Sequence, residues 1–385
     1  MLGLSKKLAA WGATAAVLVC AGVHAQEVEV GSEIRLFDGE TTFGWVPVGA
    51  ASWTVEGGAL KATTVAGGGA ALFTSTQFTD FQLDVKIRVS RSGTAGIVVR
   101  SPYDGFTGAN GAGVVMVGGR EGETQWEQVR ITAKGGDMQA TINDKVVEGF
   151  SASNKIGHIG ILYHHYHGQK SSATVEVSDV TLKPLSLKPI FNGTDLTGWN
   201  IIPDKASKFS VDEGAIHILD GNGQIETAGV YKNFLVQMDI LSNGEHLNSG
   251  VFFRGPVGVF WKGYESQVRN EWEGYEKDIK GDALPEDRTK PRDFGTGAIY
   301  GVQPARKVVS NDKEWFQKTI VANENHFATW INGYQVSDFL DTRPASDNGD
   351  GKAGYVDQAG TIHLQGHDPT TDLSFKNINL QQYPE

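Results

Sequence analysis

Two neighbouring segments in the second half of the sequence carry polar side chains that could take part in chemistry. The first is an apolar run that ends at Arg254, and the second, residues 263–270, contains Glu265, Gln267 and Arg269 at alternate positions. Because successive side chains of a β-strand point to opposite faces, these three residues should share one face. A guanidinium at the end of an apolar run can stand at the rim of a core and face a ligand. The segments therefore predict a functional site, with an ordinary solvated sheet face carrying an ion pair as the alternative.

The composition indicates which elements must position these residues. The chain has 49 glycines and only 12 prolines, and short alternating runs outnumber long helical periods. This pattern is typical of all-β sandwiches with tight turns. The 18 phenylalanines and nine tryptophans would suit sheets that stack on sugar rings, although most aromatic residues of β-sandwiches belong to the core.

Residues 1–25 have the pattern of a secretory signal peptide. Lys6 and Lys7 precede an apolar run that ends at Cys20, and a small-residue cleavage pattern follows at 23–25. The run is too short to span a bilayer, so we expect a secreted, periplasmic protein without a membrane span. Since the only cysteine lies in this segment, the mature chain should have no disulfide, thiol nucleophile or cysteine metal site.

The net charge bears on possible partners. The chain has 34 Lys+Arg against 45 Asp+Glu, and removal of the two signal-peptide lysines leaves 32 against 45, a net charge of −13. An acidic chain is repelled by phosphates, which argues against nucleic acid or an anionic membrane surface as partner.

Internal repeats indicate that the chain is a duplication. Phe-Asp-Gly at 37–39 and Trp45 recur as Phe-Asn-Gly at 191–193 and Trp199, both displaced by 154 residues (191 − 37 and 199 − 45). Further matches in the same order are 52–60 with 208–216, 81–85 with 234–238, and 95–100 with 249–254. We predict a signal peptide at 1–25, a first and degenerate β-sandwich at 26–184, a linker at 185–189 flanked by prolines, and a second β-sandwich at 190–385.

The second copy is longer than the first. Beyond Arg254 the displacement grows to 189 residues, because Trp126-Glu-Gln now corresponds to Trp315-Phe-Gln. We expect the additional segment of about 35 residues to contain the strand 264–267 and a charge-dense stretch at 271–293. That stretch would be either a solvated surface loop or a lid or rim over the site.

The two copies differ at the residues that could do chemistry. The first copy keeps counterparts of Arg254 and His367, namely Arg100 and His164. It has Leu162 at the position of Gln365, and its nearest match to the polar strand, residues 113–117, has no carboxylate. If the protein is catalytic, the second domain should therefore carry the activity.

The second copy contains a series of motifs in a fixed order, namely Asn248-Ser-Gly-Val-Phe-Phe-Arg254, Gly263-Tyr-Glu-x-Gln267, Thr296-Gly-Ala-Ile-Tyr300, Trp330-Ile-Asn-Gly333 and Gly360-x-Ile-x-Leu-Gln-Gly-His367. With these motifs, residues 190–380 resemble the 3-keto-disaccharide hydrolase family. The resemblance implies two tandem concanavalin-A-like jelly-roll β-sandwiches, an exported bacterial protein, and action on small-molecule glycosides, such as 3-keto-disaccharides, whose sugar carries a ketone at C3. The sequence departs from the family at Asn270, where an Asp is expected, and at Lys376, where an Arg is expected.

The family chemistry needs few groups. A ketone at C3 acidifies the C2 proton, so the glycosidic bond can break by elimination followed by addition of water, with one base, donors for the enolate oxygen and an acid. In this reading Glu265 is the base, Arg254 donates to the enolate or a sugar oxygen, and His367 is the proton donor or an alternative base. The expected substrate-binding residues are Gln267, Tyr300, Gln365 and Asn270.

Two other functions fit the sequence. A fold of this kind also supports non-catalytic, lectin-like carbohydrate binding. The candidate polar residues would then have a structural role, because their side chains would hydrogen-bond to neighbouring loops and turns. A conventional two-carboxylate glycosidase could combine Glu265 with Glu271 or Glu273.

No motif predicts a cofactor. The residues His164-His-Tyr-His167 are adjacent along a strand and would face opposite ways, so they make a poor metal site. The acidic turn 347–351 resembles a calcium loop only loosely and is better explained as a polar turn. A divalent ion at the site is compatible with the chemistry, but no ligand pattern supports one.

Overall fold

The structure is a computed structural model that describes residues 30–49, 51–64, 69–90, 93–103, 110–118, 125–165, 173–274 and 285–384. The predicted signal peptide lies outside these residues, as do His167 and the side chain of His164 from the histidine-rich stretch. All regular elements in the described part are β-strands, and none of its residues forms a helix long and apolar enough to cross a membrane.

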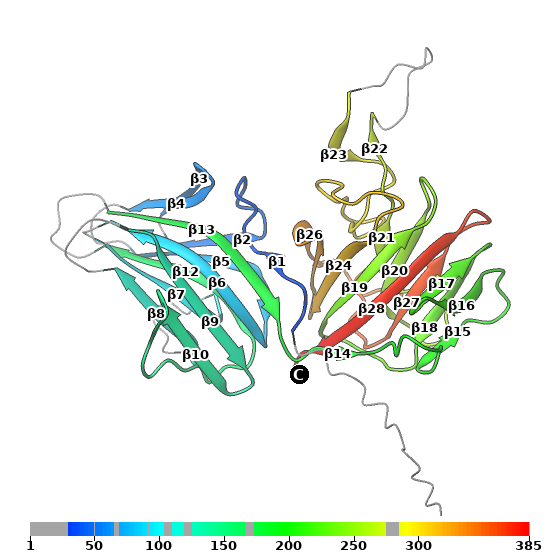
Figure 1. The fold of residues 1–385 in the computed structure, drawn as a ribbon, viewed down its shortest axis with the longest axis horizontal. Helices are drawn as coiled ribbons and strands as arrows, with labels where there is room; N and C mark the ends of the chain where they lie inside the picture. The colour runs from blue at the N-terminus through cyan, green and yellow to red at the C-terminus, as the bar shows by residue number, and fades with distance from the viewer. Residues whose placement is uncertain are drawn as a thin grey trace, which may run out of the picture.

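The first sandwich packs a larger sheet of order β11-β10-β9-β6-β13-β4-β3, with β1 paired to β13, against a smaller sheet of order β2-β5-β12-β7-β8 (Figure 1). The larger sheet consists of β1 (Ile34–Arg35), β3 (Ser52–Glu56), β4 (Ala59–Thr64), β6 (Phe81–Val89), β9 (Glu127–Lys134), β10 (Asp137–Ile142), β11 (Lys145–Val146) and β13 (Ala173–Pro184). The smaller sheet consists of β2 (Trp45–Gly49), β5 (Gly69–Phe78), β7 (Gly93–Ser101), β8 (Gly113–Gly118) and β12 (Gly157–His165).

The second sandwich has a larger sheet of order β16-β17-β28-β19-β24-β25-β26, with β14 paired to β28, and a smaller sheet of order β15-β18-β27-β20-β21. The larger sheet consists of β14 (Lys188–Pro189), β16 (Lys208–Asp212), β17 (Ala215–Leu219), β19 (Phe234–Ser242), β24 (Phe316–Asn323), β25 (His326–Ile331), β26 (Tyr334–Leu340) and β28 (Asp372–Gln382). The smaller sheet consists of β15 (Trp199–Ile201), β18 (Gly223–Thr227), β20 (Ser249–Gly255), β21 (Tyr264–Val268) and β27 (Thr361–Gly366).

The strand orders of the two sandwiches correspond strand for strand, which confirms the all-β fold class and the tandem duplication. The register corrects one detail of the repeat. Val251 pairs with Ser266 in the second sandwich as Ile97 pairs with Val115 in the first, so β21 is the counterpart of β8 and is not part of the additional segment. The added residues lie between β21 and β24, where β22 (Trp272–Glu273) and β23 (Asp287–Pro291) form a small hairpin that projects from the second sandwich (Figure 1).

The two sandwiches are held together by an apolar interface with polar contacts at its edge. Trp330 and Tyr383 of the second sandwich are buried in the same hydrophobic cluster as the core of the first. The Trp330 indole donates to the carbonyl of Arg35 at 3.0 Å, and Arg306 pairs with Asp38 at 2.7 Å. Within the predicted linker, β14 is already a strand of the second sandwich. These contacts fix the relative placement of the two domains.

Candidate active site

The smaller sheet of the second sandwich has one apolar and one polar face. Val251, Phe253 and Leu364 point into the core, as the pleat requires for alternate residues. The opposite face carries a pocket of about 150 Å³. Its lining residues are Asn248, Trp261, Glu265, Gln267, Tyr300, Lys352, Gln365 and His367. Five of the seven site residues expected from the sequence are thus brought together, and Arg254 and Asn270 are not among them.

Arg254 does not face the pocket. Its guanidinium donates to the carbonyls of Lys232 (3.0 Å) and Val356 (2.9 Å) and to the side-chain oxygen of Asn233 (3.2 Å), and the residue is almost fully buried. The φ of Arg254 is +54°, and the pairing of β20 with β27 shifts register at this point, so a β-bulge turns the side chain away from the expected face. The geometry therefore does not support the expected role of Arg254 as a substrate donor.

Asn270 is also engaged elsewhere. Its side chain accepts hydrogen bonds from Thr296 (2.6 Å) and Ser310 (2.5 Å) and donates to Asp312 (3.1 Å). These contacts anchor the added segment just beyond the end of β21. The structure thus gives Asn270 a positioning role in the loop rather than a place among the pocket residues.

Glu265 is the carboxylate of the pocket and is only 5 % exposed. Burial raises the pKa of Glu265 to about 8, against the opposing effect of the lysines Lys352 and Lys318. The Lys352 ammonium lies 3.9 Å from the carboxylate and above the Tyr300 ring, 4.7 Å from its centroid. Gly250 on the neighbouring strand leaves the space that the carboxylate occupies, because a Cβ there would collide with Glu265. The sheet is therefore built to hold a buried, basic carboxyl group beside a cation.

Lys318 supports the same strand from inside the sandwich. Its ammonium is fully buried and donates to the carbonyls of Ser266 (2.9 Å) and Gln267 (2.8 Å). Burial lowers the pKa of Lys318 to about 7, while the charge of Glu265 acts in the opposite direction. Lys318 thus fixes the backbone between the two polar residues of β21.

His367 lies at the other end of the pocket. Its Nδ1 is 3.0 Å from the Asp368 carboxylate, and its Nε2 is 3.4 Å from the side-chain amide nitrogen of Asn248. A carboxylate beside Nδ1 favours the proton on that nitrogen and leaves the Nε2 lone pair to accept from the amide. The Trp261 ring lies 6.0 Å from the imidazole, centroid to centroid.

Three side-chain amides around the pocket have unsatisfied oxygens. Asn248 Oδ1, Gln267 Oε1 and Gln365 Oε1 are buried and lack a hydrogen-bond partner among the described residues. A buried acceptor without a partner costs about 1–3 kcal/mol, and native proteins rarely keep several side by side unless a ligand or water satisfies them. The pocket is therefore suited to a ligand that presents several hydroxyl donors.

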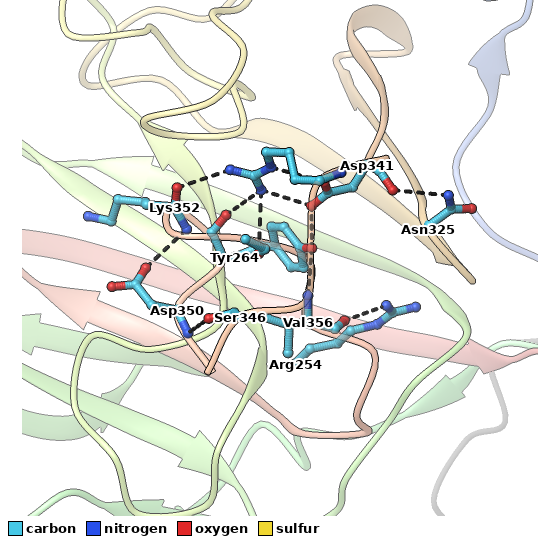
Figure 2. Close-up of polar contacts among 11 residues, drawn as sticks. Arg254, Tyr264, Asn325, Asp341, Ser346, Asp350, Lys352 and Val356 are labelled. Atoms are coloured by element: carbon cyan, nitrogen blue, oxygen red, sulfur yellow. Dashed lines mark hydrogen bonds and ion pairs between the residues drawn. The ribbon is translucent and has the colours of Figure 1, made fainter. Parts of the chain in front are cut away.

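Two loops carry residues that sequence reasoning missed. Lys352 follows the acidic turn 347–351, and Arg343 fixes its backbone by donating to the carbonyls of Lys352 (3.0 Å) and Gly351 (2.6 Å). Figure 2 shows Tyr264 of the polar strand tied to this loop, since its hydroxyl donates to Asp341 at 2.7 Å. The only signal for Lys352 in the sequence was its place beside a polar turn.

The second loop presents Trp261. The Glu226 carboxylate accepts from the backbone N–H of Gly258 at 3.0 Å, and Gln224 accepts from the N–H of Trp261 at 2.8 Å. His363, which is buried between these two side chains, has its pKa lowered to about 4 by desolvation. The Glu226 carboxylate and the Gln224 amide therefore hold the tryptophan loop in place, and the neutral imidazole of His363 packs between them.

The added segment contributes to the rim of the pocket. The backbone N–H of Tyr300 donates to the carbonyl of Glu265 at 2.9 Å, so residues around Tyr300 extend the sheet beyond β21. Asp293 accepts hydrogen bonds from Asn248 (3.1 Å) and Gln267 (3.4 Å). Of the charge-dense stretch, residues 275–284 lie outside the described part of the chain.

The second carboxylate of a conventional glycosidase is not supplied by the expected residues. Glu271 is buried against Arg269 (2.5 Å) and Arg292 (3.2 Å), and Glu273 pairs with Lys290 at 3.1 Å. Neither lines the pocket. In the described part of the chain, no three His, Cys, Asp or Glu side chains form a group that could hold a metal ion.

The corresponding face of the first sandwich is apolar. By strand register, Val114 and Met116 occupy the positions of Glu265 and Gln267. Leu162 stands at the position of Gln365, as expected from the sequence. The first sandwich therefore keeps the scaffold but lacks counterparts of Glu265, Gln267 and Gln365.

Comparison with known proteins identifies the repeated unit. The family model for the 3-keto-alpha-glucoside-1,2-lyase-like domain matches residues 32–183 and, a second time, residues 186–381. The chain belongs to this family. The 3-keto-alpha-glucoside-1,2-lyase-like domain thus occurs twice, and the family places the chain among glycosyl hydrolase-like, carbohydrate-related proteins.

Solved structures with a similar fold include two proteins of Parabacteroides distasonis that are named provisionally as glycosyl hydrolases. They share 22 % and 20 % identity with TM-scores of 0.39 and 0.40, and each match covers 51 % of this chain and 94 % or 99 % of the other. A carbohydrate-binding module of Bacillus subtilis is similar at 15 % identity and a TM-score of 0.28, over 36 % of this chain and 94 % of the module. No curated protein matches the chain.

Proposed function

We propose that the second domain hydrolyses the glycosidic bond of 3-keto-glycosides such as 3-keto-disaccharides, by C2 deprotonation, elimination and hydration. The observation that carries this proposal is the pocket in which one buried carboxylate, Glu265, lies beside Lys352 and three unsatisfied amide oxygens. Elimination next to a ketone needs a single base, whereas ordinary glycoside hydrolysis uses two carboxylates that flank the scissile bond.

Glu265 takes the C2 proton in this proposal. A base is most effective when its pKa lies near the working pH, and burial gives the Glu265 carboxyl a pKa of about 8. Removal of the proton leaves an enolate whose negative charge is shared with the C3 oxygen. Lys352 takes over the role first expected of Arg254, because its ammonium is the cation that lines the pocket.

His367 serves the leaving oxygen and the water in this proposal. Once protonated at Nε2, the imidazole donates a proton to the departing alkoxide, and the neutral form then accepts one from the water that adds to C1. Glu265 returns its proton to C2 in the same addition, which restores both groups. Asp368 holds the ring orientation through Nδ1 at 3.0 Å. The balance is one glycoside plus one water giving a 3-keto sugar and the free alcohol.

The remaining parts of the proposal concern the first domain and the location of the protein. We propose that the first sandwich is a structural partner of the catalytic domain, since its equivalent face carries Val114, Met116 and Leu162. We also propose export to the periplasm, on the basis of the signal-like residues 1–25.

The test compares turnover of a 3-keto-disaccharide with that of its unoxidised parent, with and without a chelator, by measuring release of the free sugar. Turnover of the keto form alone is expected, with Glu265→Gln reducing it by at least about 100-fold. Glu273→Gln is the matched control, because it removes an exposed carboxylate outside the pocket. Saturable glycan binding without turnover of either substrate would instead identify a lectin-like protein, and loss of turnover with the chelator would add a metal to the mechanism.

A further inference from the structure

A second cavity lies between the two sandwiches and shares no lining residue with the candidate active site. Its volume is about 570 Å³, and its walls come from β2, β5 and residues around Tyr103 on one side and from β24 to β26 on the other. Figure 1 shows β2 and β5 of the first sandwich on the side toward β24 and β26 of the second. Because the apolar interface and the Arg306–Asp38 ion pair fix both domains, the cavity is preformed.

The wall from the first sandwich is aromatic. The Tyr103 ring stacks on the His158 imidazole at 3.9 Å between centroids and 18° between planes, and Tyr103 is 38 % exposed. His158 is buried and its Nδ1 lies 2.7 Å from the carbonyl of Thr74, which fixes the ring under the tyrosine. The pair forms a flat surface of the kind on which the C–H face of a sugar ring packs.

The wall from the second sandwich is polar. Asp338 accepts a hydrogen bond from Ser75 across the interface at 2.7 Å and lies 2.8 Å from His326 Nε2. The other ring nitrogen of His326, Nδ1, is buried without a hydrogen-bond partner among the described residues. The amide side chains of Asn323 and Asn325 complete this side of the cavity.

The charges of the cavity narrow the class of ligand. Among the described residues that line it there is no Lys or Arg, whereas Glu324 and Asp338 are carboxylates. Lys232 pairs with Glu324 at 3.6 Å but is not a lining residue, so an anionic ligand such as a phosphate would meet carboxylates and no lining Lys or Arg. Amides, carboxylates and an aromatic ring suit a neutral polyhydroxylated ligand, and a cavity of this volume accommodates a mono- or disaccharide.

We propose that this interdomain cavity is a second saccharide-binding site, in which a neutral mono- or disaccharide packs on Tyr103 and donates its hydroxyls to the polar wall. The inference rests on the proposed function only for the class of ligand. It also gives the first sandwich a part in ligand binding, whereas the described residues Phe73, Val98 and Leu162 of its own outer sheet face are apolar.

The test measures the binding stoichiometry of unoxidised disaccharides, with sucrose, trehalose and maltose as probes, by titration calorimetry on the full chain. Two sites are expected. Tyr103→Ala should weaken one of them at least tenfold, and Gln365→Leu, which introduces the residue of the first copy, should weaken the other. Trp126→Ala is the matched control, because Trp126 is an aromatic residue of the first sandwich with similar exposure outside the cavity, and it should change neither site.

The outcomes separate this inference from the proposed function. Binding that Tyr103→Ala weakens, together with shifts of the His158 and His326 imidazole resonances on addition of the probe, supports the cavity even if no substrate is turned over. A single site lost only in Gln365→Leu, or no disaccharide binding that depends on Tyr103, overturns the inference even if the 3-keto-disaccharide is cleaved.

Discussion

The buried carboxyl group of Glu265 should make the protein less stable as the pH rises. Its pKa is raised from 4.5 to about 8 in the folded protein, chiefly by desolvation. Between these values the folded state keeps a proton that the unfolded state has lost, so the free energy of unfolding falls with increasing pH. Between the two pKa values the free energy of unfolding falls by about 1.4 kcal/mol for each pH unit. Burial of the Glu265 carboxyl therefore lowers the free energy of unfolding by on the order of 5 kcal/mol above pH 8 and by about 1 kcal/mol at pH 5.

Replacement of Glu265 by Gln removes this cost while keeping the shape of the side chain. We expect Glu265→Gln to raise the free energy of unfolding by about 4 kcal/mol more at pH 8 than at pH 5. Equilibrium urea unfolding at the two pH values, followed by tryptophan fluorescence, measures the difference. The lowered pKa of Lys318 has the opposite pH dependence, because its unfolded form binds the extra proton above pH 7, so the comparison is made between variant and wild type at each pH.

The control is Glu273→Gln, which makes the same chemical change at an exposed ion pair with Lys290. It should alter stability by less than about 0.5 kcal/mol at either pH. An equal effect of Glu265→Gln at pH 5 and pH 8, or a destabilisation at pH 8, would contradict the assignment of Glu265 as a buried carboxyl with a raised pKa.

Three further variants test other parts of the site. Lys352→Met should lower kcat for the 3-keto-disaccharide by about 100-fold. The increase of rate with pH, which follows deprotonation of Glu265, should move to higher pH, because Lys352 lowers the pKa of Glu265. An unchanged kcat would show that Lys352 is not the enolate donor. Asp293→Asn should move the increase of rate with pH to lower pH, because Asp293 raises the pKa of Glu265. An unchanged pH–rate profile would mean that the group that titrates in the profile is not Glu265. Arg254→Met should cost about 1–3 kcal/mol of stability in urea unfolding for each buried acceptor that loses its donor, and should leave the kcat of folded protein near wild type. A stable but inactive variant would return Arg254 to the mechanism.

The sequence predicted those features that depend on regular periodicity. Matching motifs at a constant displacement gave the duplication, and alternation along a strand placed Glu265 and Gln267 on one face, where both line the pocket. The same rule failed for Arg269, because β21 ends at Val268 and the Arg269 side chain turns to Glu271. Alternation is a property of extended backbone and gives no information beyond the last strand residue.

The placement of Arg254 away from the pocket has a different physical cause. A single residue with positive φ reverses the face on which a side chain lies, and no residue type in the motif marks Arg254 as that position. Arg100 has φ +52° and donates to the carbonyls of Thr79 and Gly135, so the bulge and its carbonyl-binding arginine occur in both copies. An arginine that is present in the apolar copy is better explained by the fold than by the chemistry.

Lys352 shows a third reason why a site residue could not be predicted from the sequence. It reaches the pocket from a loop that is distant from Glu265 in sequence, and its position depends on Arg343 and Asp341 holding that loop against Tyr264. No spacing rule connects such residues, because their proximity arises only after the sandwich has closed.

The two copies together provide an internal control for the function of the outer sheet face. They share strand order, register and the arginine bulge, which are therefore requirements of the sandwich itself. They differ at two positions that are buried in the second copy, which has Glu265 and Gln365 where the first has Val114 and Leu162. Burial of an apolar side chain lacks the desolvation penalty of a carboxylate or an amide, so the residues of the first copy favour folding. The buried carboxyl group of Glu265, the desolvated ammonium of Lys318 and three unsatisfied amide oxygens on the second copy oppose folding stability. Their presence is best explained by a ligand that pairs with the amides and by chemistry that uses the raised pKa of Glu265.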